Sequence, residues 1–173
     1  GAPALARGHR GSPDGIAQLG TTSGGGTGGH ECIPCILPCV AVQVQATLQR
    51  VSAALERGRG AEASQLLAPL ARLTSLNRDD EFRVRAAMAE AALQQDDLTE
   101  AASTLGRQPD AYREVLPDAQ LAVLWRLHGR ITFARGEQSR AIALHSRGLK
   151  HAELAHESRA IGLAHYELAL CYK

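Results

Sequence analysis

Small residues recur at an even interval along the sequence. Ala89, Gly129 and Ala169 are equally spaced, and Ala101 and Ala141 follow the first two at one shared distance. A period of this size, roughly 40 residues, is typical of stacked supersecondary units, each packed against its neighbours, rather than of one globular core. We therefore predict a repeat protein with an interaction surface rather than an active site.

The spacing of apolar residues independently predicts helices. Between residues 121 and 152 bulky and apolar residues recur three and four positions apart, as on one face of an α-helix. These residues are Leu121, Leu124, Trp125, His128 and Ile131, and then Ala141, Ile142, His145, Leu149 and Ala152. No long stretch alternates with a period of two, as a half-buried strand would. The predicted fold class is therefore all-α.

The clearest unit runs from Ala122 to His151, and its small and large residues resemble those of a tetratricopeptide repeat. Trp125, Gly129, Gly136 and Ala141 occupy places 4, 8, 15 and 20 of the unit, where that family has a large residue, two glycines and an alanine. Gly129 and Ala141 would let two antiparallel helices cross closely. Gly136 would supply the backbone freedom that the turn between them needs.

The resemblance extends over residues 40–173. It implies a right-handed superhelix of stacked antiparallel helix pairs, an α-solenoid. The units would span about 44–81, 82–121, 122–161 and, in part, 162–173. Repeats with this longer period are similar to those of kinesin light chains, polarity adaptor proteins and sensor domains of bacterial transcription activators. The resemblance thus implies a scaffold or a sensor, with no catalysis in the repeat itself.

Charge and hydropathy exclude several classes of partner. The chain has 19 basic and 18 acidic residues, a net charge of +1, so no general field attracts nucleic acid or an anionic membrane. Apolar runs are far shorter than the ~20 residues of a membrane span. Without an initiator methionine or a signal peptide pattern, the chain is expected to be part of a longer intracellular protein, cytoplasmic or nuclear.

Residues 1–39 differ from the rest in composition. They hold ten of the 17 glycines and four of the seven prolines, which predicts a flexible segment. Its Cys-rich end carries four potential zinc ligands, His30, Cys32, Cys35 and Cys39. Cys32 and Cys35 could alternatively form a redox pair. We favour a third interpretation, an apolar lead-in to the first helix without a cofactor, because no second ligand pair lies nearby.

Catalysis has no marked constellation in this sequence. His128 and His145 fall on faces that would meet a partner helix, so we expect packed, hydrogen-bonded imidazoles rather than metal ligands or acid–base groups. No local spacing marks a Ser/His/Asp or Cys/His arrangement. The chain is therefore predicted not to be an enzyme, and no catalytic residue is proposed.

Binding residues are expected on the first helix of each unit, which would line the concave face of the superhelix. Arg126 and Arg130 lie one helical turn apart, share a helix face and could hold carboxylates of a partner. The alternative is that these arginines are solvated or pair with Glu90. The predicted partner-binding residues are Arg83, Arg126, Arg130, Phe133 and Tyr166.

The predicted function is a non-catalytic scaffold that binds a peptide or helix of a partner protein on its concave face, within a larger protein or complex. The alternative is a regulatory or sensor module of a larger activator or enzyme, in which the Cys-rich segment responds to metal or redox state. The C-terminal edge around Tyr166 and Tyr172 is a further candidate for assembly with another chain.

Overall fold

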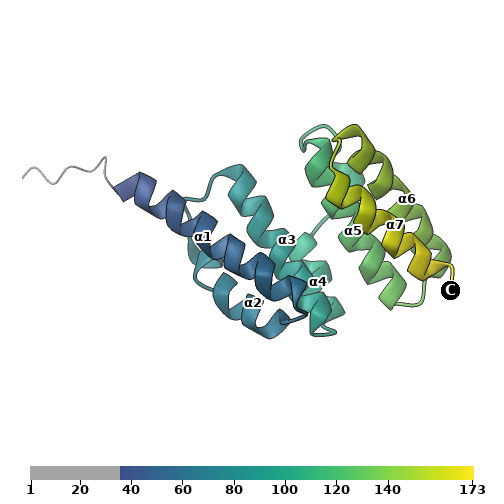
Figure 1. Cartoon of the computed structure of the whole chain (residues 1–173), viewed down its shortest axis with the longest axis horizontal. Coiled ribbons are helices and arrows are strands. Elements are labelled where there is room, and N and C mark those ends of the chain that lie inside the picture. The colour runs from purple at the N-terminus through teal and green to yellow at the C-terminus, as the bar shows by residue number, and fades with distance from the viewer. Residues whose placement is uncertain (1–35) are drawn as a thin grey trace, which may run out of the picture. The chain divides into compact units, whose positions relative to one another are not determined.

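The computed structural model describes residues 36–173, with side chains from Ala41 onward, and all regular secondary structure in this part of the chain is helical (Figure 1). No strand occurs among these residues, so the all-α prediction is confirmed for them. Within them, no helix is both long and apolar enough to cross a bilayer. The elements are α1 (Ile36–Glu56), α2 (Gly60–Leu67), η2 (Leu70–Arg72), α3 (Arg78–Gln94), α4 (Leu98–Leu105), η3 (Pro109–Tyr112), α5 (Asp118–Ala134), α6 (Gln138–Leu154) and α7 (Ser158–Cys171).

Five helices begin at equal intervals, each half a sequence period after the one before. One period of the sequence therefore contains two α-helices and their connections, and the connection between α4 and α5 includes η3. The predicted units start at residues 82, 122 and 162, about one helical turn after the first residues of α3, α5 and α7. The repeat pattern therefore begins inside the first helix of each unit. The first residues of these helices are Arg78, Leu98, Asp118, Gln138 and Ser158.

Four tight turns between helices share one backbone geometry. Gly58, Asp96, Gly136 and His156 have positive φ angles of 69°, 59°, 81° and 55°. In each turn the next residue's amide donates to the carbonyl five residues before it, at 2.9 to 3.1 Å. A left-handed residue at this position closes the end of a helix and satisfies its last carbonyls. The turn predicted at Gly136 is confirmed.

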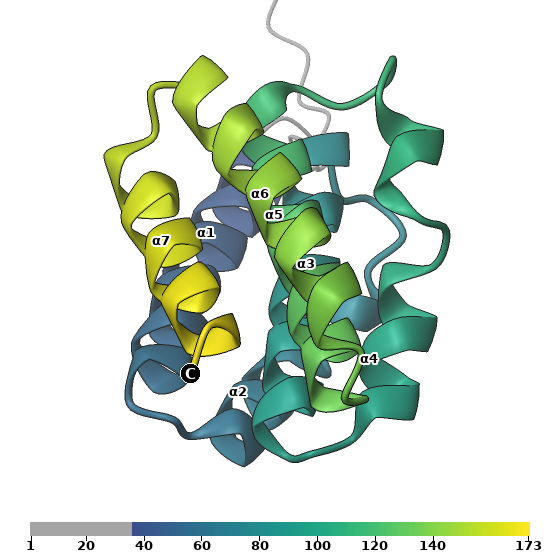
Figure 2. The same ribbon diagram turned by 90° about the vertical axis from the view of Figure 1, so that its right-hand side faces the viewer.

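Consecutive helices pack where a small residue meets a large one. A Cβ on Gly129 would lie only 2.6 Å from the His145 ring, and one on Gly148 would lie 3.3 Å from the Cβ of Trp125. Both contacts join α5 to α6, which pack against each other extensively (Figure 2). Gly129 therefore marks a close approach of the two helices as predicted, and it faces His145. Ala141, the second residue expected at the crossing, is fully buried.

Candidate partner-binding groove

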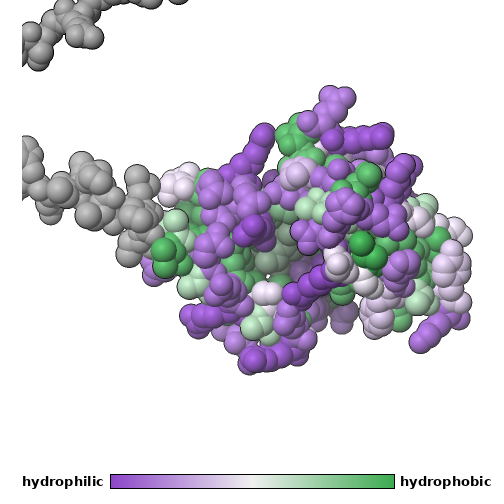
Figure 3. Space-filling model, turned by 45° about the horizontal axis from the view of Figure 1, so that its top comes forward, coloured by the Kyte–Doolittle hydropathy of each residue, from purple (hydrophilic) through white to green (hydrophobic). Residues whose placement is uncertain are grey.

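A groove lies where the four odd-numbered helices face one another. It has a volume of about 310 Å³ and receives side chains from α1, α3, α5 and α7. Polar residues cover much of the molecular face in Figure 3, with smaller apolar areas among them. The groove is mixed in the same way, because Leu55, Val123 and Leu163 line it beside Glu90 and Arg126.

An ion-pair network joins three of these helices. Glu90 on α3 accepts a hydrogen bond of 2.8 Å from Arg126 on α5 and a second hydrogen bond from Arg130. Glu167 on α7 lies 3.7 Å from Arg126 and 3.5 Å from Arg130. The four side chains are only 12 to 25% exposed. Two positive and two negative charges thus form a nearly buried network that is neutral as a whole.

The two carboxylates of the network differ in pKa. Burial opposes ionisation of Glu90, but attraction and hydrogen bonding by Arg126 and Arg130 outweigh it and lower its pKa. For Glu167, whose contacts with the arginines are longer, burial is the largest cause and raises the pKa. The repulsion of Glu90 acts in the same direction on Glu167. Glu90 is therefore the carboxylate that holds the arginines.

One exposed ion pair connects α1 and α7 at the groove. Arg159 donates a hydrogen bond to Glu56, although the two residues lie 103 positions apart in the chain. Their side chains are 70% and 53% exposed, and a pair this exposed contributes about 0 to 1 kcal/mol. Both residues line the groove, so this contact can open at little cost.

The predicted binding residues do not all meet in the groove. Arg126 lines it, and Arg130 belongs to the ion-pair network, where both arginines pair with Glu90 as the alternative interpretation described. Arg83 is exposed on α3 and forms an ion pair of 2.8 Å with Asp79. Phe133 and Tyr166 are 40% and 61% exposed and are not among the groove residues. The structure therefore brings together two of the five.

Several groove residues were not predicted. Leu55 and Glu56 come from α1, which falls in the unit with the weakest repeat pattern. Arg159 also lines the groove, from α7. Glu167 of the same helix was not predicted either, and it belongs to the ion-pair network rather than to the groove lining. One signal in the sequence could have indicated Glu167, because it follows Arg126 and Arg130 by nearly one repeat period.

His128 and His145 are buried as predicted, with exposures of 6% and 1%, but the predicted hydrogen bonding is wrong for three of their ring nitrogens. Among the described residues, Nε2 of His128 and both ring nitrogens of His145 have no hydrogen-bond partner. Burial, followed by the charges of Arg126 and Arg130, lowers the pKa of His145 to about 4. The ring is therefore neutral at pH 7. The His145 ring packs against Gly129. Such packing buries the ring without placing a hydrogen-bond partner beside its nitrogens.

The Cys-rich cluster falls mostly outside the described residues. His30, Cys32 and Cys35 precede Ile36, and Cys39 lies in the first turn of α1, so the helix begins before the predicted boundary at residue 40. Among the described side chains, no group of three or more His, Cys, Asp or Glu residues could hold a metal ion. The zinc and redox interpretations of the cluster stay predictions.

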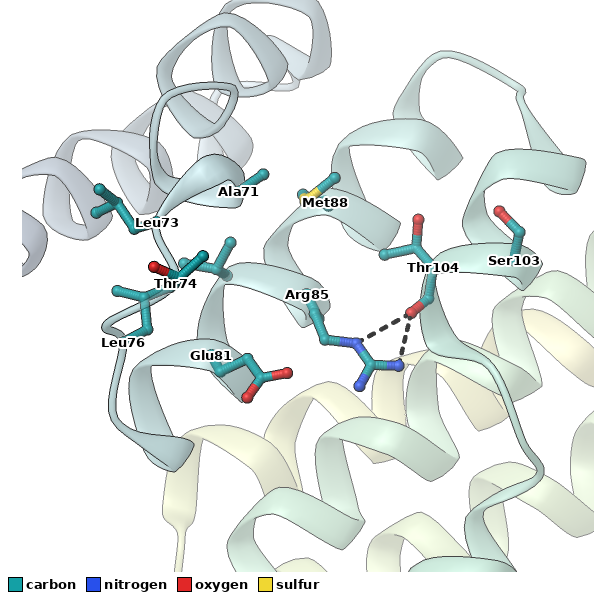
Figure 4. A pocket seen from close by; sticks show the side chains of 10 residues that line it. Ala71, Leu73, Thr74, Leu76, Glu81, Arg85, Met88, Ser103 and Thr104 are labelled. Carbon is teal, nitrogen blue, oxygen red and sulfur yellow. Dashed lines mark hydrogen bonds between the residues drawn. The ribbon is translucent and has the colours of Figure 1, made fainter.

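A second hollow, of about 640 Å³, lies beside α3 (Figure 4). It lies where α2 and α4, with eight residues each against 17 in α3, leave Met88 on α3 half-buried. Arg85 points across it and donates to the Thr104 carbonyl oxygen at 3.1 and 3.4 Å. Two of the five N–H donors of its guanidinium are therefore already bound to a backbone oxygen.

Comparison of the chain with models of protein families, with curated proteins and with solved structures finds no match. The resemblance to tetratricopeptide repeats therefore stays a prediction. The function is argued below from the groove and its residues.

Proposed function

We propose that the chain is a non-catalytic scaffold that binds a peptide or helix of a partner protein in the groove between α1, α3, α5 and α7. In this proposal the helix pairs form a right-handed superhelix of the tetratricopeptide type, and the groove lies on its concave face. One observation carries the proposal. Apolar residues from several helices line the groove beside a charge network that is already neutral.

The neutral network defines the chemistry of the partner. A partner carboxylate would compete with Glu90 for Arg126 and Arg130, and would leave a nearly buried charge without a partner, which is strongly unfavourable. An apolar side chain, in contrast, removes water from Leu55, Val123 and Leu163 without disturbing any ion pair. The partner therefore contributes apolar anchor residues. Phe133 and Tyr166 are candidates for contacts outside the groove.

A selection of peptides tests this proposal. Peptides that bind the chain would be enriched from a displayed random library, and the affinity of the best ones measured by calorimetry. Leu163→Asp should weaken binding at least tenfold, about 1.4 kcal/mol, because a charge enters the apolar part of the groove.

Leu73→Asp is the matched control. Leu73 is 39% exposed, against 37% for Leu163, and lies at the second hollow, so this variant should bind the peptides normally. Circular dichroism would verify that both variants keep their helices. Equal effects of the two substitutions, or a failure to enrich any peptide, would show that the groove is not the binding site.

A further inference from the structure

Gly162, within α7, differs from every other glycine among the described residues. Nothing lies within 4 Å of the place where a Cβ on Gly162 would be, and its φ is not in the left-handed region. A glycine inside a helix costs about 1 kcal/mol relative to alanine. Of the others, Gly58, Gly106 and Gly136 have positive φ angles, and Gly60, Gly129 and Gly148 lie in close contact with a neighbouring helix. The described chain thus gives no reason for a glycine at position 162.

The face of α7 that carries Gly162 has no neighbour among the described helices. On α5, Trp125 and Gly129 are buried against α6. One period later, the corresponding residues of α7, His165 and Ala169, are exposed. Tyr172 is 72% exposed, the highest value among the large exposed hydrophobic residues described. This face therefore has the pattern of a helix contact without its partner helix.

On this face, small and large residues are placed symmetrically about one position in the sequence. In the pair α5 and α6, each helix provides a glycine that receives a large residue of the other, Gly129 with His145 and Gly148 with Trp125. Gly162, His165 and Ala169 lie on α7, and Tyr172 directly follows its last residue. The small residues Gly162 and Ala169 and the large residues Tyr172 and His165 form two such pairs, both centred on residue 167. When two identical helices pack antiparallel, one alignment of the helices brings together all residue pairs that have the same midpoint in the sequence.

We propose that two copies of the chain associate through α7, packed antiparallel to α7 of the second copy. Seating Tyr172 over Gly162 of the other copy also seats His165 against Ala169, and the two-fold axis makes each contact twice. The face between Ile161 and Tyr172 that makes these contacts carries no Asp, Glu, Lys or Arg, so like charges do not oppose the pairing. A single helix pair is a small interface, and the dimer is reversible.

The oligomeric state of the full chain tests this inference. Sedimentation equilibrium from about 10 μM to about 1 mM should show the mass rise from 18.4 kDa toward twice that value. Gly162→Leu should weaken the dimer at least tenfold, because its side chain fills the space that receives Tyr172. The same variant should melt at an equal or higher temperature, because leucine favours a helix more than glycine does.

Two tyrosine variants complete the experiment. Tyr172→Ala should weaken the dimer, whereas Tyr166→Ala should not, because Tyr166 corresponds to Arg126, which faces the groove on α5. A wild-type chain that stays monomeric at every concentration would overturn the inference and leave this face to another segment or another protein. A dimer that Gly162→Leu does not weaken would overturn it as well.

Discussion

At the scale of single residues, His145 has the most unusual environment in the described chain. It is 1% exposed, and neither ring nitrogen has a hydrogen-bond partner. A buried polar group without a partner costs about 1 to 3 kcal/mol. Gly129 explains why a ring occupies this place, since only a residue without a Cβ lets the imidazole lie so close to α5.

This environment predicts a loss of stability in mild acid. The pKa of His145 falls from 6.5 to about 4 on folding, so the folded state binds fewer protons than the unfolded state between these values. The titration of His145 leaves the free energy of unfolding unchanged above about pH 6.5 and lowers it as the pH falls toward 4, by at most about 3 kcal/mol. Urea unfolding at pH 7 and pH 4.5 measures this loss of unfolding free energy. His145→Phe keeps a ring against Gly129 and should reduce the loss, and an unchanged pH dependence would contradict this account.

At the scale of secondary structure elements, the helix ends show how packing selects a backbone. Gly58 and Gly136 adopt the left-handed conformation freely, but Asp96 and His156 adopt it in turns with the same hydrogen bonds. For a residue with a side chain, this conformation costs about 1 to 2 kcal/mol. The packing of the flanking helices therefore fixes the turn whether or not the local residue favours it.

Replacement of His156 by glycine should stabilise the chain. His156 is exposed, has a φ of 55° and loses no buried contact, so His156→Gly should raise the free energy of unfolding by about 1 kcal/mol. Chemical denaturation measures the change. Gly136→Ala, at the equivalent turn with a φ of 81°, is the control and should lower it by a similar amount. A destabilised His156→Gly variant would mean that the imidazole itself supports the turn.

At the scale of the whole described unit, the ion-pair network connects helices that the turns do not connect. Glu90, Arg126 and Glu167 belong to α3, α5 and α7, which are separated in the chain by other helices. Reversing both Arg126 and Arg130 to glutamate would gather four carboxylates in a nearly buried place. Single neutral substitutions are therefore the better probe of the network.

Glu90→Gln and Glu167→Gln should differ in cost. Glu90→Gln leaves two arginines with one distant carboxylate and should lower the free energy of unfolding by about 3 kcal/mol. Glu167→Gln removes a carboxylate whose burial already raises its pKa, and should cost less than about 1 kcal/mol. Denaturation at pH 7 compares them. Equal losses would show that both carboxylates hold the arginines equally.

Features that depend on neighbours along the chain or on the repeat period could be predicted from the sequence alone. The sequence predicted the helices, the turn at Gly136, the close approach at Gly129 and the burial of His128 and His145. These predictions needed only the helical spacing of apolar residues and the positions of the small residues. Which charges meet depends on tertiary packing, which selects the pairing with Glu90 that the sequence offered as one alternative and adds Glu167. Arg126 and Arg130 contact Glu90 and Glu167 on helices that are not consecutive with α5, and Leu55 and Leu163 line the same groove from α1 and α7. Such contacts depend on how the helices stack, because the angle between two helices decides which of their exposed side chains come within reach.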